Sequence, residues 1–108
     1  MLKKEYRLSA VSLISPRIFS SPCFSLKVAA NKKNLSRFAF VVSKRIDKRA
    51  VVRNSLKRKI RSGIEQIFDN IEIGYDFVFY PKQKAQGATR EQVMEEINEI
   101  FLKNKLLK

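Results

Sequence analysis

The sequence predicts an α+β fold, an α-β sandwich in which a four-stranded sheet has helices packed on one side. Two observations predict this class: short segments in which apolar residues alternate with polar ones, and longer segments in which they recur every three or four positions. The segments follow one another as helix, three strands, helix, strand and helix. With 108 residues, 44% of them hydrophobic, residues 1–108 are expected to form a single domain with one modest core.

The first half of the chain carries a short helix and three strands. Ser9 can cap a helix over residues 10–14, which must end before Pro16. Strands are expected over residues 17–19, 23–30 and 37–44. In the last two, large apolar residues on one face alternate with small or polar residues on the other. The face with small residues is therefore suited to leave a shallow cleft open.

The second half carries two helices and one strand. They are expected over residues 48–69, 75–80 and 90–104, in the order helix, strand, helix. Asp47 offers an N-cap for the first of these helices. Thr89 with Gln92 three positions later forms a capping box for the last one.

Charge is unevenly distributed along the sequence. The chain contains 23 Lys or Arg, 10 Asp or Glu and no His, which gives a formal net charge of +13. Residues 1–61 hold 17 of these cations and 2 of the acids, whereas residues 62–108 hold 6 and 8. This excess of cations predicts that the first half meets a nucleic acid or an anionic membrane, while the second half completes the core.

The residue types disfavour several other chemistries. Cys23 is the only cysteine, so no intramolecular disulfide can form, and we expect it to be a small buried side chain. A protein metal site is not expected in a chain without histidine. The longest apolar run, FAFVV, is too short to cross a bilayer. Serines and Pro16 interrupt the weak likeness of the N-terminal segment to a targeting peptide, so we expect a mature, cytoplasmic chain.

The segment RAVVRNSLKRKIR (49–61) separates into two neighbouring stripes when its residues are placed at 100° intervals around a helix. The apolar stripe, which continues beyond the segment, comprises Val52, Leu56, Ile60, Gly63, Ile64 and Ile67. The polar stripe comprises Arg53, Asn54, Lys57, Arg58 and Arg61. Solvated helix faces usually interleave Glu with Lys, but this stripe has no acid to relieve the repulsion between its cations. A polyanionic ligand is therefore the favoured explanation.

Folded RNA is a better candidate ligand than DNA or a membrane. Strands flank the basic helix, whereas a helix-turn-helix motif would need a second short helix joined by a tight turn. A membrane-surface helix would need its apolar stripe free of the core, and here the stripe is required for packing. A rigid basic ridge suits the recognition of RNA by shape and phosphate charge.

The segment VSKRIDKRAVVRNSLKRKIR (42–61) closely resembles the signature of the bacterial ribonuclease P protein subunit, the small basic partner of a catalytic RNA. The matching positions are Arg49, Ala50, Val51, Arg53, Asn54, Lys57, Arg58 and Arg61. Ser55 departs from the pattern, because the family usually has Arg there. The likeness extends to KKEYRL, FSLKV, RFAFVVSK, YDFVFYPK and the Thr-capped last helix, and so covers nearly the whole chain.

The resemblance implies both a topology and a function. The family has a rare left-handed crossover from the third strand through the basic helix to the fourth strand. Its protein assists a catalytic RNA in the removal of 5′ leaders from precursor tRNA. The RNA carries out the chemistry with Mg²⁺, and the protein alone is inactive. Ribonuclease P RNA and precursor tRNA are thus the expected partners, with no role for DNA or a membrane.

The resemblance also assigns two sets of residues. Those expected to bind the catalytic RNA are Lys44, Arg45, Lys48, Arg49, Arg53, Asn54, Lys57, Arg58 and Arg61. Candidates for a cleft that holds the single-stranded leader are Phe19, Ser25, Lys27, Ala39, Val41, Ser43 and Tyr80. The family typically supplies aromatic residues to this cleft from a longer first helix, which is shortened here. Phe19 could substitute, although its pattern favours the core.

Two other functions are weighed against this one. A ribosomal or general structured-RNA-binding protein on a related sandwich would carry similar charge and take no part in cleavage. An autonomous protein nuclease is disfavoured, because hydrolysis would want a His, a carboxylate cluster or a metal site. The chain has no His, and Asp47 is the only acid in the basic region.

Overall fold

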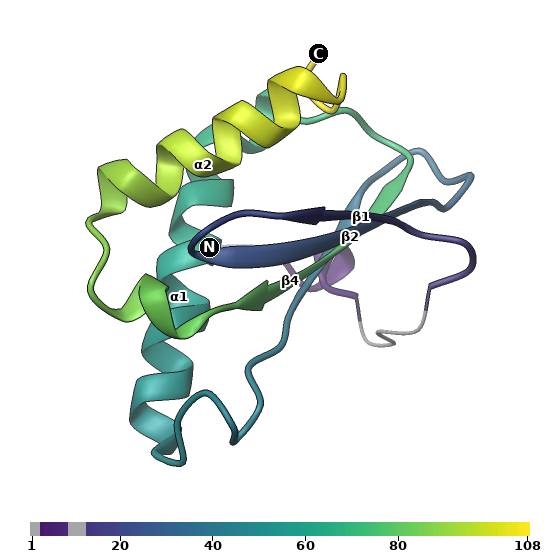
Figure 1. The fold of residues 1–108 in the computed structure, drawn as a ribbon. Coiled ribbons are helices and arrows are strands. Elements are labelled where there is room, and N and C mark those ends of the chain that lie inside the picture. The colour runs from purple at the N-terminus through teal and green to yellow at the C-terminus, as the bar shows by residue number, and fades with distance from the viewer. Residues whose placement is uncertain (1–2, 9–12) are drawn as a thin grey trace.

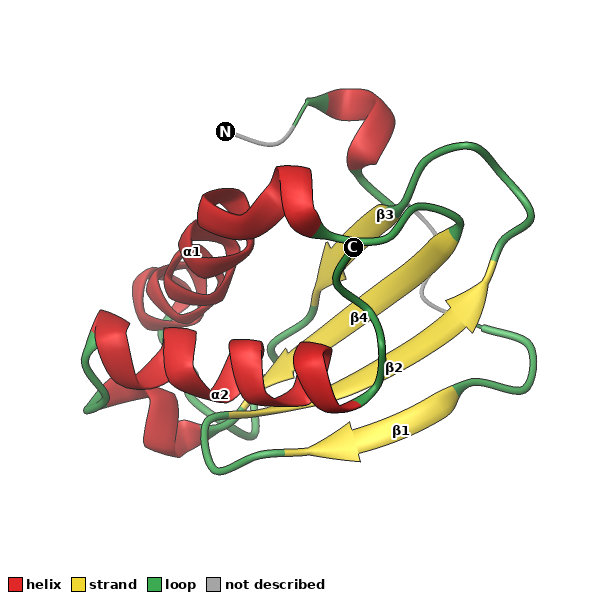
Figure 2. Ribbon diagram, turned by 90° about the horizontal axis from the view of Figure 1, so that it is seen from above, coloured by secondary structure: helices red, strands yellow, loops and turns green. Residues whose placement is uncertain are grey.

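Two helices pack against one face of a four-stranded sheet in the computed structural model of this protein, which describes residues 3–8 and 13–108 (Figure 1, Figure 2). The strands are β1 (Arg17–Ser20), β2 (Phe24–Ala30), β3 (Arg37–Phe40) and β4 (Tyr75–Pro81), and the helices are α1 (Ala50–Ile67) and α2 (Arg90–Lys103). Short 3₁₀ helices occur at η1 (Lys4–Tyr6), η2 (Phe68–Asn70) and η3 (Gln83–Gln86). The predicted α+β class, with helices on one side of a four-stranded sheet, is confirmed.

The order of strands in the sheet is β1-β2-β4-β3. All neighbours are antiparallel except β3 and β4, which run parallel and are joined through α1. A parallel pair needs such a crossover, because a tight turn can join only antiparallel neighbours. The expected crossover through the basic helix is therefore present, and its left-handedness stays a prediction from the family.

Large apolar residues form rows across the helix-covered face of the sheet. One row contains Leu26, Phe79 and Phe40, and the next contains Val28, Phe77 and Phe38. Phe101 of α2 stacks on the Phe77 ring, with 5.3 Å between the ring centroids. Each such side chain contributes roughly 1.5–3 kcal/mol when it is fully buried. The core therefore lies between this face and the two helices.

The apolar stripe of α1 packs into this core, as its spacing predicts. Leu56, Ile60, Gly63 and Ile64 are buried. Gly63 lies where α1 and α2 come close together, and a Cβ atom there would be only 2.8 Å from the Cδ1 atom of Ile97. Because α1 is fixed along this stripe, its neighbouring basic stripe is held in a fixed direction.

The start of α1 differs from the prediction. Asp47 was expected to cap a helix from about residue 48, but the helix begins at Ala50, and Arg49 is its N-cap residue without a side-chain cap. The Asp47 carboxylate instead accepts a hydrogen bond from the Arg49 backbone N–H, at 2.8 Å. This local bond two residues ahead is typical of Asp in turns and delays the helix.

Other boundaries also differ from the prediction. The predicted strand 37–44 ends at Phe40, although the Val41 N–H still donates to the Phe79 carbonyl. A turn closed by the Ile46 N–H and the Ser43 carbonyl then takes the chain away from β4. The predicted cap Ser9 and residues 10–12 of the predicted first helix lie outside the described residues, and residues 13–14 are not helical. The short helix η1 was not predicted.

Truncation of Ile60 tests whether this stripe carries the fold. Ile60 is 0% exposed, so Ile60→Ala is expected to lower the free energy of unfolding by about 2–5 kcal/mol through lost burial and a cavity. Val51→Ala on the same helix is the matched control. Val51 is 81% exposed, and its replacement is expected to change stability by less than about 0.5 kcal/mol. Equal effects in urea unfolding would show that the helix faces are assigned the wrong way round.

Candidate nucleic-acid interface

The residues expected to bind RNA lie on α1 and on the loop that leads into it. Lys44, Arg45, Lys48 and Arg49 are exposed in this loop. On the helix, Asn54 and Arg58 are exposed, whereas Arg53, Lys57 and Arg61 are half-buried. We call these nine residues, Lys44, Arg45, Lys48, Arg49, Arg53, Asn54, Lys57, Arg58 and Arg61, the basic ridge. The structure brings them together on one element and its entrance.

Arg53 ties the loop to the helix. Its Nη1 atom donates to the backbone carbonyls of Asp47 and Lys48, at 3.1 and 2.7 Å. A guanidinium has five N–H donors in a fixed plane, so the other donors stay available to a ligand. Arg53 therefore holds the loop in place and adds charge to the ridge.

Asp47 and Arg49 form a two-pronged ion pair within the same loop. The Nε and Nη2 atoms of Arg49 donate to the two carboxylate oxygens of Asp47, at 3.0 and 2.9 Å. Hydrogen bonds from the Arg49 side chain and backbone lower the pKa of Asp47 to about 2. Asp47 therefore stays charged at neutral pH and fixes the direction of the Arg49 guanidinium.

The remaining cations of the ridge have fewer contacts. The guanidinium of Arg61 lies over the Phe40 ring, 5.3 Å from its centroid. The side chains of the other five make no hydrogen bond or ion pair with any described residue; they are Lys44, Arg45, Lys48, Lys57 and Arg58. Cations at i,i+4 spacing on a helix repel one another. These five therefore have their full charge available for an anionic ligand.

Lys59 stands within the basic sequence but takes a different role. Its ammonium donates to the carbonyls of Ala85 and Ala88, at 2.8 and 2.9 Å, and lies 3.4 Å from that of Gln86. These carbonyls belong to the segment between β4 and α2. Lys59 thus fastens that segment to α1, and it is not part of the basic ridge.

The face of the sheet opposite the helices carries most of the predicted leader-cleft residues. Ser25, Lys27 and Tyr80 are half-buried there, and the Lys27 ammonium lies 5.4 Å from the centroid of the Tyr80 ring. The pairing of Lys27 with Val78, and of Val78 with Ala39, places a small apolar centre on the same face. We call this surface the open sheet face.

Not every predicted cleft residue lies on the open sheet face. Phe19 pairs with Leu26 and packs against the core, so it lies on the helix-covered side. Ala39 is on the open face but only 8% exposed, and it offers little surface. Val41 is half-buried and Ser43 is exposed, and both lie just beyond the end of β3. The structure thus brings Ser25, Lys27 and Tyr80 together and sets Phe19 apart.

A buried charge pair at the edge of this face was missed by the sequence reasoning. Arg37 donates from Nε and Nη2 to the two oxygens of Asp76, at 2.9 and 2.8 Å, and the Asn31 amide adds a third bond. Burial favours the neutral form of Asp76, but the bonds from Arg37 and Asn31 outweigh it and lower the pKa. The pair links β3 to β4. Arg37 and Asp76 lie far apart in the sequence, so no local sequence pattern indicates that their side chains meet.

Cys23 has the buried position that was expected of it. Burial and the neighbouring Glu96 carboxylate raise the pKa of the Cys23 thiol to about 11. Glu96 itself accepts hydrogen bonds from the Ser21 hydroxyl and the Cys23 backbone N–H. The thiol is therefore protonated at neutral pH, which makes it a poor nucleophile.

Residues 3–8 and 13–108 contain no group of three or more His, Cys, Asp or Glu side chains that could hold a metal ion. No helix within the same part of the chain has the length and hydropathy needed to cross a bilayer.

Comparisons with known proteins agree with the resemblance. The family model described as Ribonuclease P matches residues 2–105. A ribonuclease P protein component from Clostridium kluyveri is 33% identical over 92 residues, which cover 83% of this chain and 81% of that protein. A second relative of that name, from Synechocystis, is 36% identical over 66 residues, 61% of this chain and 53% of that protein. The aligned part of this chain thus spans about half the length of the Synechocystis relative.

Solved structures of two RNase P proteins have the same fold. The protein from Staphylococcus aureus superposes with a TM-score of 0.73 at 23% identity, over 86% of this chain and 84% of that one. The protein from Thermotoga maritima gives a TM-score of 0.71 at 23% identity, over 80% and 81%.

The Arg37–Asp76 pair generates a prediction about pH. Because the pKa of Asp76 is lowered in the folded protein, the pair stabilises the fold above the ordinary carboxyl pKa of 3.8, and this contribution is lost as pH falls through the lower folded value. At pH 7, Asp76→Asn is expected to cost about 1.5–3 kcal/mol. The deficit relative to the unmodified protein should shrink below pH 4 in denaturant titrations. Asp69→Asn, which alters an exposed carboxylate, is the control, and a deficit independent of pH would contradict the assigned ion pair.

Proposed function

Because the chain belongs to the ribonuclease P protein family, we propose that it is the protein subunit of the ribonucleoprotein that removes 5′ leaders from precursor tRNA. The observation that carries this proposal is the basic ridge, whose five uncommitted cations lie on a helix fixed by the core and on the loop that leads into it. The general RNA-binding alternative rests on charge alone. Family membership therefore favours the processing subunit. We also propose that the protein acts in the cytoplasm.

In this proposal the basic ridge holds the phosphates of the catalytic RNA. Lys57 and Arg58 supply uncommitted charge, whereas Arg49 and Arg53 present guanidinium groups whose directions are already fixed. Such pre-orientation reduces the conformational entropy that is lost when RNA binds. Ser55 is exposed on the same helix, so the missing Arg of the family pattern removes a phosphate contact and leaves the helix intact.

The open sheet face would hold the single-stranded leader. Tyr80 offers an aromatic surface for a base, and Lys27 beside it offers a charge for a phosphate. The described part of this face has no second aromatic side chain beside Tyr80, because Phe19 lies on the other side of the sheet. Because few bases can stack here, we expect the affinity for the leader to be lower than that for the catalytic RNA.

We assign the chemistry and its Mg²⁺ to the RNA. The described residues offer no cluster of ligands that fits a metal ion. The part of this protein is to bind and orient the two RNAs. Positioning of reactants alone can account for several kcal/mol of a reaction barrier.

The salt dependence of binding tests the basic ridge. Each phosphate that a cation neutralises contributes roughly 0.7–0.9 to the slope of log affinity against log salt concentration. Lys57→Ala with Arg58→Ala is therefore expected to lower the slope for ribonuclease P RNA by about 1.5 and to weaken binding. Replacement of Lys103 and Lys105 by Ala removes equal charge outside the ridge. If both double variants lose the same affinity, total charge and not the ridge governs binding.

Reconstitution tests the division of labour. The purified protein is expected to leave precursor tRNA intact with or without Mg²⁺, since the sequence has no His and residues 3–8 and 13–108 form no carboxylate cluster near the ridge. Addition of a bacterial ribonuclease P RNA and Mg²⁺ should yield the mature 5′ end. Cleavage by protein that has been freed of RNA would show that the chemistry is in the protein.

A further inference from the structure

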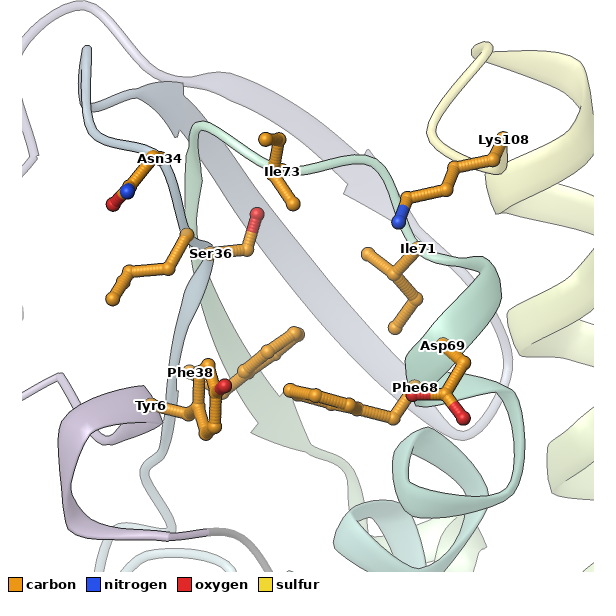
Figure 3. A pocket seen from close by; sticks show the side chains of 10 residues that line it. Tyr6, Asn34, Ser36, Phe38, Phe68, Asp69, Ile71, Ile73 and Lys108 are labelled. Atoms are coloured by element: carbon orange, nitrogen blue, oxygen red, sulfur yellow. The ribbon is translucent and has the colours of Figure 1, made fainter.

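A cavity of about 200 Å³ lies near the C-terminal end of α1, between η1, β3 and the segment 68–73 (Figure 3). Its lining residues are Tyr6, Asn34, Leu35, Ser36, Phe38, Phe68, Asp69, Ile71, Ile73 and Lys108. Three aromatic rings gather at one end of it, and the Lys108 side chain reaches toward Ile71 at the other. None of the residues proposed for the ridge or the leader cleft lines this cavity.

The rings at the aromatic end of the cavity pack against one another and against the core. The Phe38 ring is stacked on Phe77 of the core, with 5.1 Å between centroids and 7° between planes. Tyr6 meets Phe68 edge to face, with 4.8 Å between centroids. Phe38 is only 2% exposed and also meets Phe68, with 6.0 Å between centroids, so a planar ring in the cavity would lie against the half-buried Tyr6 and Phe68 rings.

The backbone around the cavity is held in place independently of any ligand. Gly74 adopts a φ of +92°, which permits its N–H to donate to the Leu35 carbonyl while its own carbonyl accepts from Asn31. The Lys108 N–H donates to the Asn70 carbonyl at 2.7 Å. This bond fixes the position from which the Lys108 side chain extends.

The polar side chains at the rim are available. Asn34, Asp69 and Lys108 make no side-chain hydrogen bond or ion pair with any described residue. The Ser36 hydroxyl, in contrast, is committed to the Glu72 carbonyl and the Tyr75 N–H. Lys108 is thus the cation at this cavity that can meet an anion.

We propose that this cavity binds one unstacked nucleobase of an RNA, with the Lys108 ammonium on the adjacent phosphate. An apolar cavity of about 150 Å³ is large enough to hold benzene, so the observed space admits a single base. Proteins recognise single-stranded RNA by stacking splayed bases on aromatic rings. The net charge of +13 favours a polyanion over an uncharged peptide as the source of the ring.

The proposal rests on the proposed function, because it extends the RNA contact to a second place on the molecule. Its location gives it a distinct geometry. Helix α1 has 18 residues and is therefore about 27 Å long. The basic ridge begins before its first turn, and the cavity lies beyond its last. An RNA that reaches both is held at two ends of one rigid rod, which restricts its rotation about either contact.

The first test uses small probes with the full chain. Adenosine 5′-monophosphate is expected to shift the amide NMR signals of Ile71 and Ile73, and to bind about tenfold more tightly than ribose 5-phosphate, which has no base. Adenosine, which has no phosphate, should bind more weakly than the monophosphate. Lys108→Ala should remove this advantage of the phosphate and leave the affinity for adenosine unchanged.

Two variants with added bulk locate the site. Ile73→Trp places a large ring in the cavity and is expected to abolish the shifts, whereas Leu102→Trp on the exposed surface of α2 should retain them. In binding to ribonuclease P RNA, Ile73→Trp should lower affinity about tenfold and lower the salt slope by no more than roughly 0.7–0.9, the share of the one phosphate that Lys108 holds.

Three results would overturn the proposal. They are equal binding of ribose 5-phosphate and the monophosphate, shifts that map to Tyr80 instead of Ile73, and tighter binding of N-acetylphenylalanine amide than of the nucleotide. The last would identify a protein side chain as the occupant. Because the probes need no catalytic RNA, the cavity is tested even if the ridge fails to bind that RNA.

Discussion

The structure depends on the packing of the apolar stripe of α1 against the sheet. The basic stripe of the same helix lies beside it and must stay charged and exposed. Leu56, Ile60 and Ile64 of α1 are buried against the sheet, and the basic stripe lies next to them on the same helix. Burial of these three side chains contributes several kcal/mol, about 1.5–3 kcal/mol each. Repulsion between cations at i,i+4 spacing costs only a few tenths of a kcal/mol per pair. The core can therefore hold the basic stripe in place although its charges oppose one another.

The protein also lowers that repulsion from within. Lys59 and Arg53 turn their charges toward backbone carbonyls, and Asp47 neutralises part of Arg49. Lys59 fastens the segment between β4 and α2 to α1, and the contacts of Arg53 and Asp47 fasten the loop before α1. The cations in between, such as Lys57 and Arg58, are left uncommitted. Charge within this sequence therefore divides into cations that shape the surface and cations that are free to bind.

Much of this could be predicted from the sequence, because periodic burial leaves a local signal. The alternation of β2 and the 3.6-residue period of α1 gave the sheet, the buried stripe and the basic stripe. The Thr89 cap was also predictable, and its side chain accepts a hydrogen bond from the Gln92 N–H at 3.1 Å. The start of α1 was not, because Asp47 can bond either to a helix end or to the N–H two residues ahead, and both have the same sequence signature.

Long-range pairing explains what the sequence could not show. Asp76 is charged inside the sheet because β3 brings Arg37 beside it, and pairing with Leu26 fixes Phe19 on the core side, which its sequence pattern favoured but could not fix. The cavity near Tyr6 likewise joins residues from four separate parts of the chain, none of which forms a motif. Contacts of this kind depend on strand order, and the order β1-β2-β4-β3 follows from packing of the whole domain.

Acidic and basic side chains lie on different surfaces of the molecule, so its charge distribution is asymmetric. Glu91, Glu95 and Glu99 lie at i,i+4 spacing on the exposed side of α2, whereas the basic ridge lies on α1. At physiological ionic strength charges act over roughly 8 Å, so these two surfaces influence an approaching polyanion separately. A polyanion is attracted to α1 and repelled from the acidic side chains on the exposed side of α2. This asymmetry therefore turns an approaching polyanion toward α1 before any hydrogen bond forms. Because α1 is packed on the core, the basic ridge then meets the polyanion in a fixed geometry.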